Sequence, residues 1–367
     1  MKIFCQQSEL FDALNTATHA LSAKAPIQAL ECVYIRPEGQ TVELICSDLH
    51  MTVKSRILAS FEGLKTSVLL PGKLFTDIVR KLPEGDMTLD VSTTFSVKIT
   101  AQQSRTTLQG IDASGYPQLP VLEDGAQKVT IHEATFKDMV RGTAFAVATD
   151  ESRPILTGVF MEFEGDHVNM VGLDGFRLAM RRGFAQAPAP MNALVPGRYL
   201  SEVCKLLPGG DETLTLSFGA NHLYMNLGST DIFIRLLEGE YIKYRQIIPQ
   251  NPPISVKISH RALEECVERA SLIAYEGKTN LIRMNIEDDR MIITSNNESG
   301  DVYESIEAAH FGSPINISFN VRYVADMLKA IDDDELMMLF STPVSPCTVK
   351  PVSDESFLYL ILPVRTH

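Results

Sequence analysis

The stretch VTIHEATFKDMVRGTAFAV, residues 129–147, occurs in three related versions along the chain. The other two are IFCQQSELFDALNTATHAL at residues 3–21 and VKISHRALEECVERASLIA at residues 256–274, and the three align without gaps at offsets of 126 and 127. In each version alternating apolar residues predict a strand, and the apolar residues that follow at helical spacing predict an amphipathic helix. A period this long exceeds those of solenoids and propellers, so it indicates a domain that is present three times.

A second element repeats at the same period and again reads strand, helix, strand. Its versions are SVLLPGKLFTDIVRKLPEGDMTLDV at 67–91, NALVPGRYLSEVCKLLPGGDETLTL at 192–216 and INISFNVRYVADMLKAIDDDELMMLF at 315–340. Between the two elements, VELICSDLHMTVKSRI, VNMVGLDGFRLAMRR and MIITSNNESGDVYESI occupy equivalent places and predict β-hairpins. Each domain therefore holds two helices, and hairpins rather than βαβ alternation place them on one side of antiparallel sheets. The predicted fold class is α+β, with domains at residues 1–125, 126–252 and 253–367.

Composition limits the classes of protein that the chain can belong to. Hydrophobic residues make up 45% of its 367 residues, which is typical of packed globular domains. The six cysteines are scattered, which indicates thiols in a reducing compartment rather than disulfides or a metal site. The start, MKIFCQQSELFD, is too polar for a signal peptide, and the apolar run at 358–362 is too short to span a membrane. We expect a cytoplasmic protein with no membrane partner.

Basic residues recur at two positions of the second helix in all three repeats. Lys73, Arg198 and Arg322 align, and Arg80, Lys205 and Lys329 align seven residues later, two turns along the same helix face. In the first copy, Leu74, Ile78 and Leu82 are expected to face the sheet. A net charge of −13 by itself argues against nucleic acid. For any one helix a solvated surface explains the basic residues, but their recurrence in an acidic chain favours a function for that face.

Six quasi-equivalent strand–helix units per chain suggest closure into a ring. Two chains would place twelve helices inside, and a spacing of roughly 9 Å between axes gives a circle about 35 Å across. Subtracting about one helix diameter leaves a hole of about 24 Å, which admits a DNA duplex with a layer of water. Helices that span the grooves would contact phosphates without reading bases, so such a ring would slide.

At this point the sequence resembles a known family, the beta subunit of DNA polymerase III, which forms the bacterial sliding clamps. The resemblance covers the whole chain and is most specific at ESRPILTGVF (151–160), GLDGFRLA (172–179), YLILPVRTH (359–367) and the helix starts at Pro71 and Pro196. It implies the DNA-clamp fold and a head-to-tail homodimeric ring around double-stranded DNA. It also implies an ATP-dependent clamp loader as a partner, and a pocket that binds short motifs of the replicative polymerase catalytic subunit, other polymerases and repair proteins.

The resemblance assigns residues to three sites. The peptide pocket would consist of Leu156, Leu173, Gly175, Phe176, Arg177, Leu178, Ile242, Ile247, Val344, Leu362, Pro363, Val364 and Arg365. The DNA-facing set would add Lys24 and Arg153 to the six basic helix positions, and the dimer interface would hold Leu108, Leu272 and Ile273. An apolar C-terminal strand can line a groove for a linear peptide, and Arg177 and Arg365 could anchor its carbonyls or carboxylate. For Leu156 and Leu178 alone, plain core packing is the alternative.

Several positions depart from the family pattern. Ile242 and Lys243 stand where Pro–Asp is common, Leu173 where a small hydroxyl residue is frequent, and Phe176 where histidine is common. Thr106 replaces a large aromatic residue that some relatives carry at the subunit boundary. We therefore expect changes in the preferred peptide motif and in the strength of the dimer.

The sequence contains no catalytic motif. There is no GxxxxGK[ST], GxSxG or HExxH, and the acidic run at 332–335 is typical of a solvated turn. We predict a protein that is not an enzyme and has no cofactor or metal. The alternatives are a ring-shaped protein-interaction scaffold that does not act on DNA, and a hydrolase or transferase with an unrecognised site. Retention on circular but not linear DNA separates the three.

Overall fold

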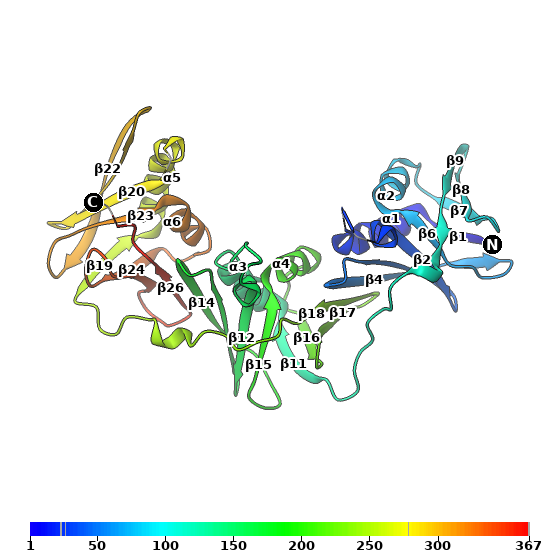
Figure 1. The fold of residues 1–367 in the computed structure, drawn as a ribbon, viewed down its shortest axis with the longest axis horizontal. Helices are drawn as coiled ribbons and strands as arrows, with labels where there is room; N and C mark the ends of the chain where they lie inside the picture. Colours follow the sequence, from blue (N-terminus) through cyan, green and yellow to red (C-terminus); the bar gives the residue numbers. More distant parts are fainter. Residues whose placement is uncertain (23, 26, 278, 366–367) are drawn as a thin grey trace. The chain divides into compact units, whose positions relative to one another are not determined.

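The computed structural model describes residues 1–22, 24–25, 27–277 and 279–365 (Figure 1). They form two compact units. Unit 1 consists of Met1–Thr130, Lys205–Pro208 and Thr213–Leu236, and unit 2 of Ile131–Cys204, Gly209–Glu212 and Leu237–His367. Unit 1 combines the first repeat with part of the second, and unit 2 combines the rest of the second repeat with the third. This division does not follow the three repeats, so the domain boundaries near 125 and 252 stay a prediction.

The first strand and helix of each repeat occur where the sequence pattern predicts them. Strands β1 (Lys2–Gln6), β11 (Gln127–His132) and β19 (Ile254–Ser259) lead directly into α1 (Gln7–Ala17), α3 (Glu133–Ala144) and α5 (His260–Glu276). Their helical apolar positions are buried, among them Leu10, Phe136 and Leu263 at 0% exposure. Full burial of one such side chain contributes about 1.5–3 kcal/mol, so these aligned positions hold each helix against its sheet.

The second strand–helix pairs also repeat. Strands β6 (Val68–Pro71), β15 (Met191–Pro196) and β23 (Ile315–Asn320) lead into α2 (Gly72–Lys81), α4 (Gly197–Leu206) and α6 (Val321–Leu328). The predicted buried face of α2 is partly wrong. Leu74 is 51% exposed, while Phe75 and Val79 are fully buried. The buried stripe runs through Gly72, Phe75 and Val79, whose spacings of three and four residues bring them to one side of the helix.

Unit 1 contains two sheets. One has the order β5-β1-β7-β8-β9 and ends at β9, and the other has the order β10-β6-β2-β3-β4-β18-β17-β16-β11. The second sheet crosses from the first repeat to the second because β18 pairs antiparallel with β4, with Thr52 opposite Phe233. The strands not yet given are β2 (Cys32–Glu38), β3 (Thr41–Ser47), β4 (Met51–Leu58), β5 (Ser60–Glu62), β7 (Asp86–Val91), β8 (Ser96–Ala101), β9 (Ser104–Gln109), β10 (Ile111–Asp112), β16 (Thr213–Phe218), β17 (His222–Leu227) and β18 (Thr230–Arg235).

Unit 2 contains one sheet of twelve strands, in the order β15-β12-β13-β14-β26-β25-β24-β19-β22-β21-β20-β23. It crosses from the second repeat to the third where β26 pairs antiparallel with β14, with Leu178 opposite Leu360. The strands not yet given are β12 (Gly158–Glu164), β13 (His167–Leu173), β14 (Arg177–Phe184), β20 (Leu281–Glu287), β21 (Arg290–Asn297), β22 (Gly300–Phe311), β24 (Glu335–Phe340), β25 (Cys347–Pro351) and β26 (Phe357–Ile361).

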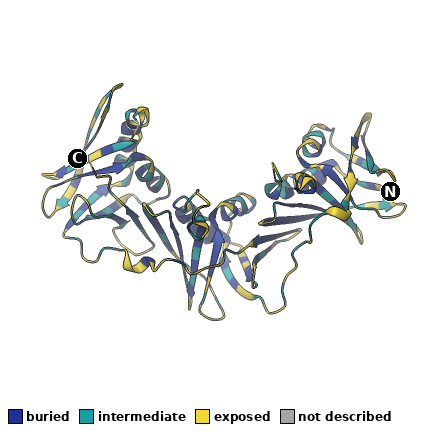
Figure 2. Ribbon diagram, in the orientation of Figure 1, coloured by how far each residue is buried: buried dark blue, intermediate teal, exposed yellow. Residues whose placement is uncertain are grey.

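Buried residues lie along the strands and on the sides of the helices that face them (Figure 2). The helices therefore keep their other sides available to solvent or to a ligand. Within the described ranges, no helix is both long and apolar enough to cross a membrane.

Candidate functional site

Three leucines from the predicted peptide pocket form a floor beside the β14–β26 pair. Leu156 lies in the short 3₁₀ helix at Pro154–Thr157, Leu173 ends β13, and Leu178 lies in β14. They are 4%, 3% and 2% exposed and share one cluster with Leu360 of β26. Core packing and pocket lining are thus compatible here, because the leucines are buried while partly exposed residues such as Ile155 and Met180 pack against their cluster.

The segment that connects the second and third repeats is fixed to this cluster by two tyrosines. The ring of Tyr241 stacks on that of Phe160 with centroids 4.8 Å apart, and its hydroxyl donates to the Val171 carbonyl at 3.2 Å. The hydroxyl of Tyr244 donates to Glu162 Oε2 at 2.7 Å, and Arg245 pairs with the same carboxylate. Burial raises the pKa of Glu162, but the hydrogen bonds from Arg245 and Tyr244 outweigh it and leave that pKa lowered. The carboxylate therefore stays charged and holds the segment in place.

Six other residues of the predicted pocket have exposed apolar side chains, namely Phe176, Ile242, Ile247, Val344, Leu362 and Val364. Backbone bonds position two of them: the Leu362 amide donates to the Phe176 carbonyl at 2.8 Å, and the Val364 amide donates to the Ser318 carbonyl at 2.8 Å. Pro363 is half-buried and Arg365 exposed within the same terminal segment. Exposed apolar side chains and a buried apolar floor are components that a site for a linear peptide needs.

Arg177 is a positioning residue in this arrangement. Its guanidinium donates to Asp174 Oδ2 at 3.1 Å, to Asp326 Oδ2 at 2.7 Å and to the Phe145 carbonyl at 2.7 Å. It also lies 4.6 Å from the centroid of the Tyr323 ring. All three nitrogens are thus engaged within the chain, which leaves Arg177 less free to anchor a partner than the sequence suggested.

A hollow of about 860 Å³ lies next to this floor in unit 2. It brings together members of two sites that the sequence treated as separate: Leu156, Gly175, Phe176 and Arg177 of the pocket, and Arg153 and Arg322 of the DNA-facing set. Gly175 has φ +95°, a conformation that favours glycine and turns the chain into β14. Sequence reasoning missed the residues that complete the wall, namely Val147, Ala148, Thr149, Asp150, Ser152, Asp174, Asn280, Asn320, Tyr323 and Asp326. No local pattern marks them, because they come from loops and from a helix of another repeat.

The basic helix positions are all exposed. Lys73 and Arg80 lie on α2, Arg198 and Lys205 on α4, and Arg322 on α6, while Lys329 caps the end of α6; Lys24 and Arg153 are also exposed. Arg80 pairs with Asp77 at 2.7 Å, one turn before it, and Arg198 lies against the ring of Tyr199 at 5.5 Å. Neither contact removes the charge from the surface, so these positions can attract phosphates.

The predicted dimer residues differ in what they offer to a partner. Leu272 on α5 is 70% exposed, and Ile273 beside it is half-buried. Leu108 in β9 is 7% exposed and already packed within its own sheet. Most of the new apolar contact at such an interface would therefore come from Leu272.

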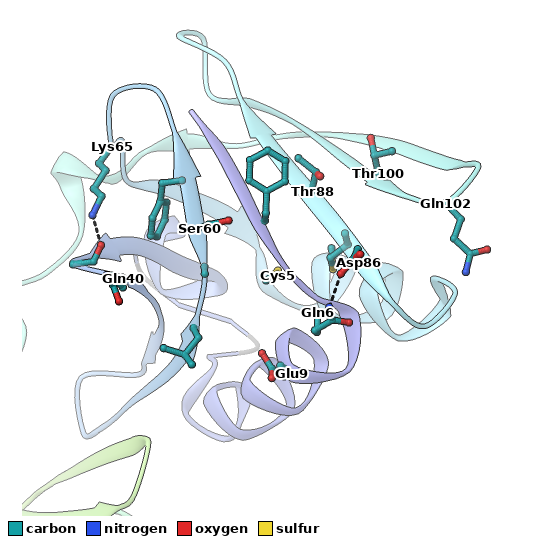
Figure 3. A pocket seen from close by; sticks show the side chains of 16 residues that line it. Cys5, Gln6, Glu9, Gln40, Ser60, Lys65, Asp86, Thr88, Thr100 and Gln102 are labelled. Atoms are coloured by element: carbon teal, nitrogen blue, oxygen red, sulfur yellow. Dashed lines mark hydrogen bonds between the residues drawn. The ribbon is translucent and has the colours of Figure 1, made fainter.

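The largest other hollow of those described lies in unit 1, between β5, β1 and the turn before β7, and has a volume of about 1150 Å³ (Figure 3). Its lining mixes polar side chains with apolar ones such as Phe4 and Phe61. Gln6 donates to Asp86, and Lys65 donates to the Gly39 carbonyl. Burial raises the pKa of Cys5 to about 12, which makes its thiol a poor nucleophile. Within the described residues, His, Cys, Asp and Glu are nowhere grouped as metal ligands would be. None of the predicted site residues lies here.

Comparison with known proteins agrees with this geometry. Models of the N-terminal, central and C-terminal domains of the DNA polymerase III beta subunit match residues 1–120, 130–243 and 245–365. The beta sliding clamp of Staphylococcus aureus is 32% identical over 378 residues, covering 100% of both chains. The solved DNA polymerase sliding clamp of Bacillus subtilis and a putative beta subunit of Eubacterium rectale are each 29% identical, with a TM-score of 0.95 over 100% of both chains.

These matches do not favour a scaffold that acts apart from DNA, and they confirm the α+β fold with three clamp domains. With models of all three domains and a full-length relative in agreement, the chain belongs to the family of the DNA polymerase III beta subunit, the sliding clamps that serve replication as non-catalytic processivity factors.

Proposed function

We propose that two copies of this chain close head to tail into a ring around duplex DNA, slide along it and tether a replicative DNA polymerase through the pocket beside β14 and β26. The observation that carries the proposal is the buried leucine floor of Leu156, Leu173 and Leu178, together with the exposed side chains of Phe176 and Leu362, whose backbones are hydrogen-bonded to each other. A partner's short extended segment can bury its own apolar side chains against such residues while its backbone stays near the surface.

Two sheet edges support the ring. Strand β9 ends its sheet in unit 1. In unit 2, Gly300–Glu307 of β22 pairs with β21 along one side, and in the described structure its other side has no strand partner, because β19 joins β22 only from Ala308 onward. An exposed edge readily pairs with another chain. Pairing β9 of one copy with β22 of the next is a heterologous contact, which closes a ring when the rotation fits.

Charge on the two edges is complementary. Lys98 and Arg105 are exposed on β8 and β9, whereas Glu298, Asp301 and Glu307 are exposed on and before β22. Such opposite patches favour head-to-tail pairing and disfavour pairing of like edges. Leu272, an exposed leucine of α5, would supply apolar contact.

Binding to DNA would be electrostatic and independent of sequence. The six aligned helix positions, with Lys24 and Arg153, carry side chains long enough to reach phosphates, and helices that do not enter a groove read no bases. The proposed partners are the catalytic subunit of the replicative polymerase, an ATP-dependent clamp loader, and other polymerases and repair proteins with short docking segments. The loader would open one edge contact of the ring, and the other partners would share the pocket.

Retention on DNA tests the proposal. The protein is loaded with a competent clamp loader and ATP onto nicked circular or linearised duplex, and both samples are washed at high salt, which removes ordinary phosphate binding. Retention on circles with loss from linear ends is the expected result. Equal loss from both would refute encirclement. A variant with Leu178→Asp should still be retained on circles but should fail to bind a polymerase, which separates the pocket from the ring.

A further inference from the structure

The structure contains two junctions between repeats, one in each unit, and both are built on the same scaffold. In unit 1 the Arg235 amide donates to the His50 carbonyl at 2.7 Å beside the β4–β18 pair, as the Leu362 amide donates to the Phe176 carbonyl at 2.8 Å in unit 2. In the turns before β4 and β14, one aspartate oxygen accepts two backbone amides. Asp48 accepts those of His50 and Met51, and Asp174 accepts those of Phe176 and Arg177.

The segments that follow each junction are also held alike. Tyr116 lies against Tyr34 of β2 with ring centroids 4.9 Å apart, as Tyr241 lies against Phe160 of β12 at 4.8 Å. Leu30, in the 3₁₀ helix Gln28–Glu31, takes the place of Leu156 and is equally buried. A hollow of about 330 Å³ remains at the first junction, between the β3–β4 turn and the segment at 116–123. The first junction therefore has the same strand pair, aspartate turn, 3₁₀ helix and aromatic contact as the predicted peptide pocket.

The two floors differ in chemistry. Ser47 ends β3 where Leu173 ends β13, and Thr52 lies in β4 where Leu178 lies in β14. The Ser47 and Thr52 hydroxyls are 2.8 Å apart and share a hydrogen bond, and both side chains are buried. Leu173 and Leu178 of the second junction are thus each matched by a hydroxyl residue in the first, at the same paired positions: Ser47 lies opposite Thr52 as Leu173 lies opposite Leu178.

We propose that Ser47 and Thr52 are specificity-determining residues that close the first junction to apolar peptides, so that each chain binds one such peptide, at the second junction. This inference rests on the proposed function of the Leu173–Leu178 pocket. An apolar side chain over the hydroxyl pair would lose the contact with two leucines and would strip water from the remaining hydroxyl lone pairs. Loss of one buried leucine contact lowers affinity by about ten- to a hundredfold, so the combined loss removes measurable binding.

Peptide stoichiometry tests the inference. The probe is a labelled synthetic peptide, Ser-Leu-Ser-Leu-Phe, whose two leucines point to one side when it is extended. Isothermal titration of the full chain should give one peptide per chain in the wild type and none in L173S/L178T, which copies the hydroxyl floor into the second junction. S47L/T52L should bind two, and the variant with all four substitutions should again bind one, now at the first junction.

Each other outcome is decisive. A wild-type stoichiometry of two, with one peptide retained in L173S/L178T, overturns the inference and leaves the proposed pocket standing. Folded S47L/T52L that still binds one peptide also overturns it. If S47L/T52L fails to fold, the variant S47A/T52V removes the hydroxyls at nearly constant volume. This variant should bind a second peptide about tenfold more weakly than the first. A single binding step would refute the role of the hydroxyls. No binding to the wild type would refute the peptide pocket itself, and the inference with it.

Discussion

Removal of the Arg177 guanidinium should loosen the hairpin that carries the pocket floor. Arg177→Met keeps most of the side-chain stem and deletes the three hydrogen bonds to Asp174, Asp326 and the Phe145 carbonyl. Breaking a buried ion pair by removing one partner costs about 3–5 kcal/mol. Because the side chain of Asp326 is 36% exposed and regains water, we discount this to a loss of about 2–4 kcal/mol.

The loss can be measured globally and locally. Urea unfolding gives the change in the free energy of unfolding of unit 2, and native-state hydrogen exchange reports the amides of Phe176 and Arg177, which are bonded to Asp174. A double-mutant cycle with Asp326→Asn isolates the contribution of the 2.7 Å contact, for which we expect a coupling of about 1–2 kcal/mol. A total loss below about 0.5 kcal/mol, or no coupling, would show that Arg177 does not hold the hairpin to α6.

Three further predictions concern charge and assembly. Burial raises the pKa of Glu43, but hydrogen bonds from Arg36 and Arg56 outweigh it, so the folded-state pKa lies below the ordinary 4.5. The charged Glu43 therefore stabilises the fold above about pH 4.5, and this stabilisation is lost as the pH falls through the folded-state pKa. The thermal midpoint of the wild type should fall more steeply between about pH 5 and 3 than that of Glu43→Gln. Parallel plots of thermal midpoint against pH for the two proteins would contradict this. Lys73→Glu should weaken the direct binding of the protein to linear duplex at low salt and reduce the slope of log K against log [salt] by about one, whereas Lys65→Glu in the unit 1 hollow should do neither. Equal effects of the two substitutions would show that the α2 face does not contact DNA. Leu272→Asp should convert the dimer to monomer in sedimentation at micromolar concentration. The control Leu64→Asp, the same change at another exposed leucine, should stay dimeric, and an unchanged dimer for Leu272→Asp would place the interface elsewhere.

The local patterns predict the elements closely, because helix and strand periods are properties of short stretches. The helices predicted to start at Pro71 and Pro196 begin one residue later, at Gly72 and Gly197. The prediction that Leu74 faces the sheet was wrong because α2 has apolar residues on more than one side. Periodicity alone does not tell which of these apolar stripes packs against the sheet. Only packing shows that Phe75 and Val79 fill that place.

The sites were less predictable because they depend on contacts between distant segments. The leucine floor follows from the resemblance of GLDGFRLA to the family, but the engagement of Arg177 by Asp326 joins residues 149 positions apart. Tyr323 and Asn280 enter the hollow through the third repeat, and nothing in their own neighbourhood marks them. Likewise, the resemblance assigns Leu108 to the dimer interface, and only the structure shows that this side chain is already buried in β9 of its own chain.

The strand pairs that cross the junctions have a consequence for anyone who divides the chain into recombinant fragments. A fragment that stops near residue 125 would lack β18 and so strip β4 of its neighbour, together with the Arg56–Asp231 ion pair and the 3.2 Å contact between Ser55 Oγ and Thr230 Oγ1. Its unprotected strand would be free to recruit other copies. Such a fragment is expected to precipitate or form soluble aggregates during purification. A product that runs through Leu236 would keep the whole of unit 1 but would lack β26 and leave one edge of β14 unpaired, so the full chain is the form expected to stay monodisperse.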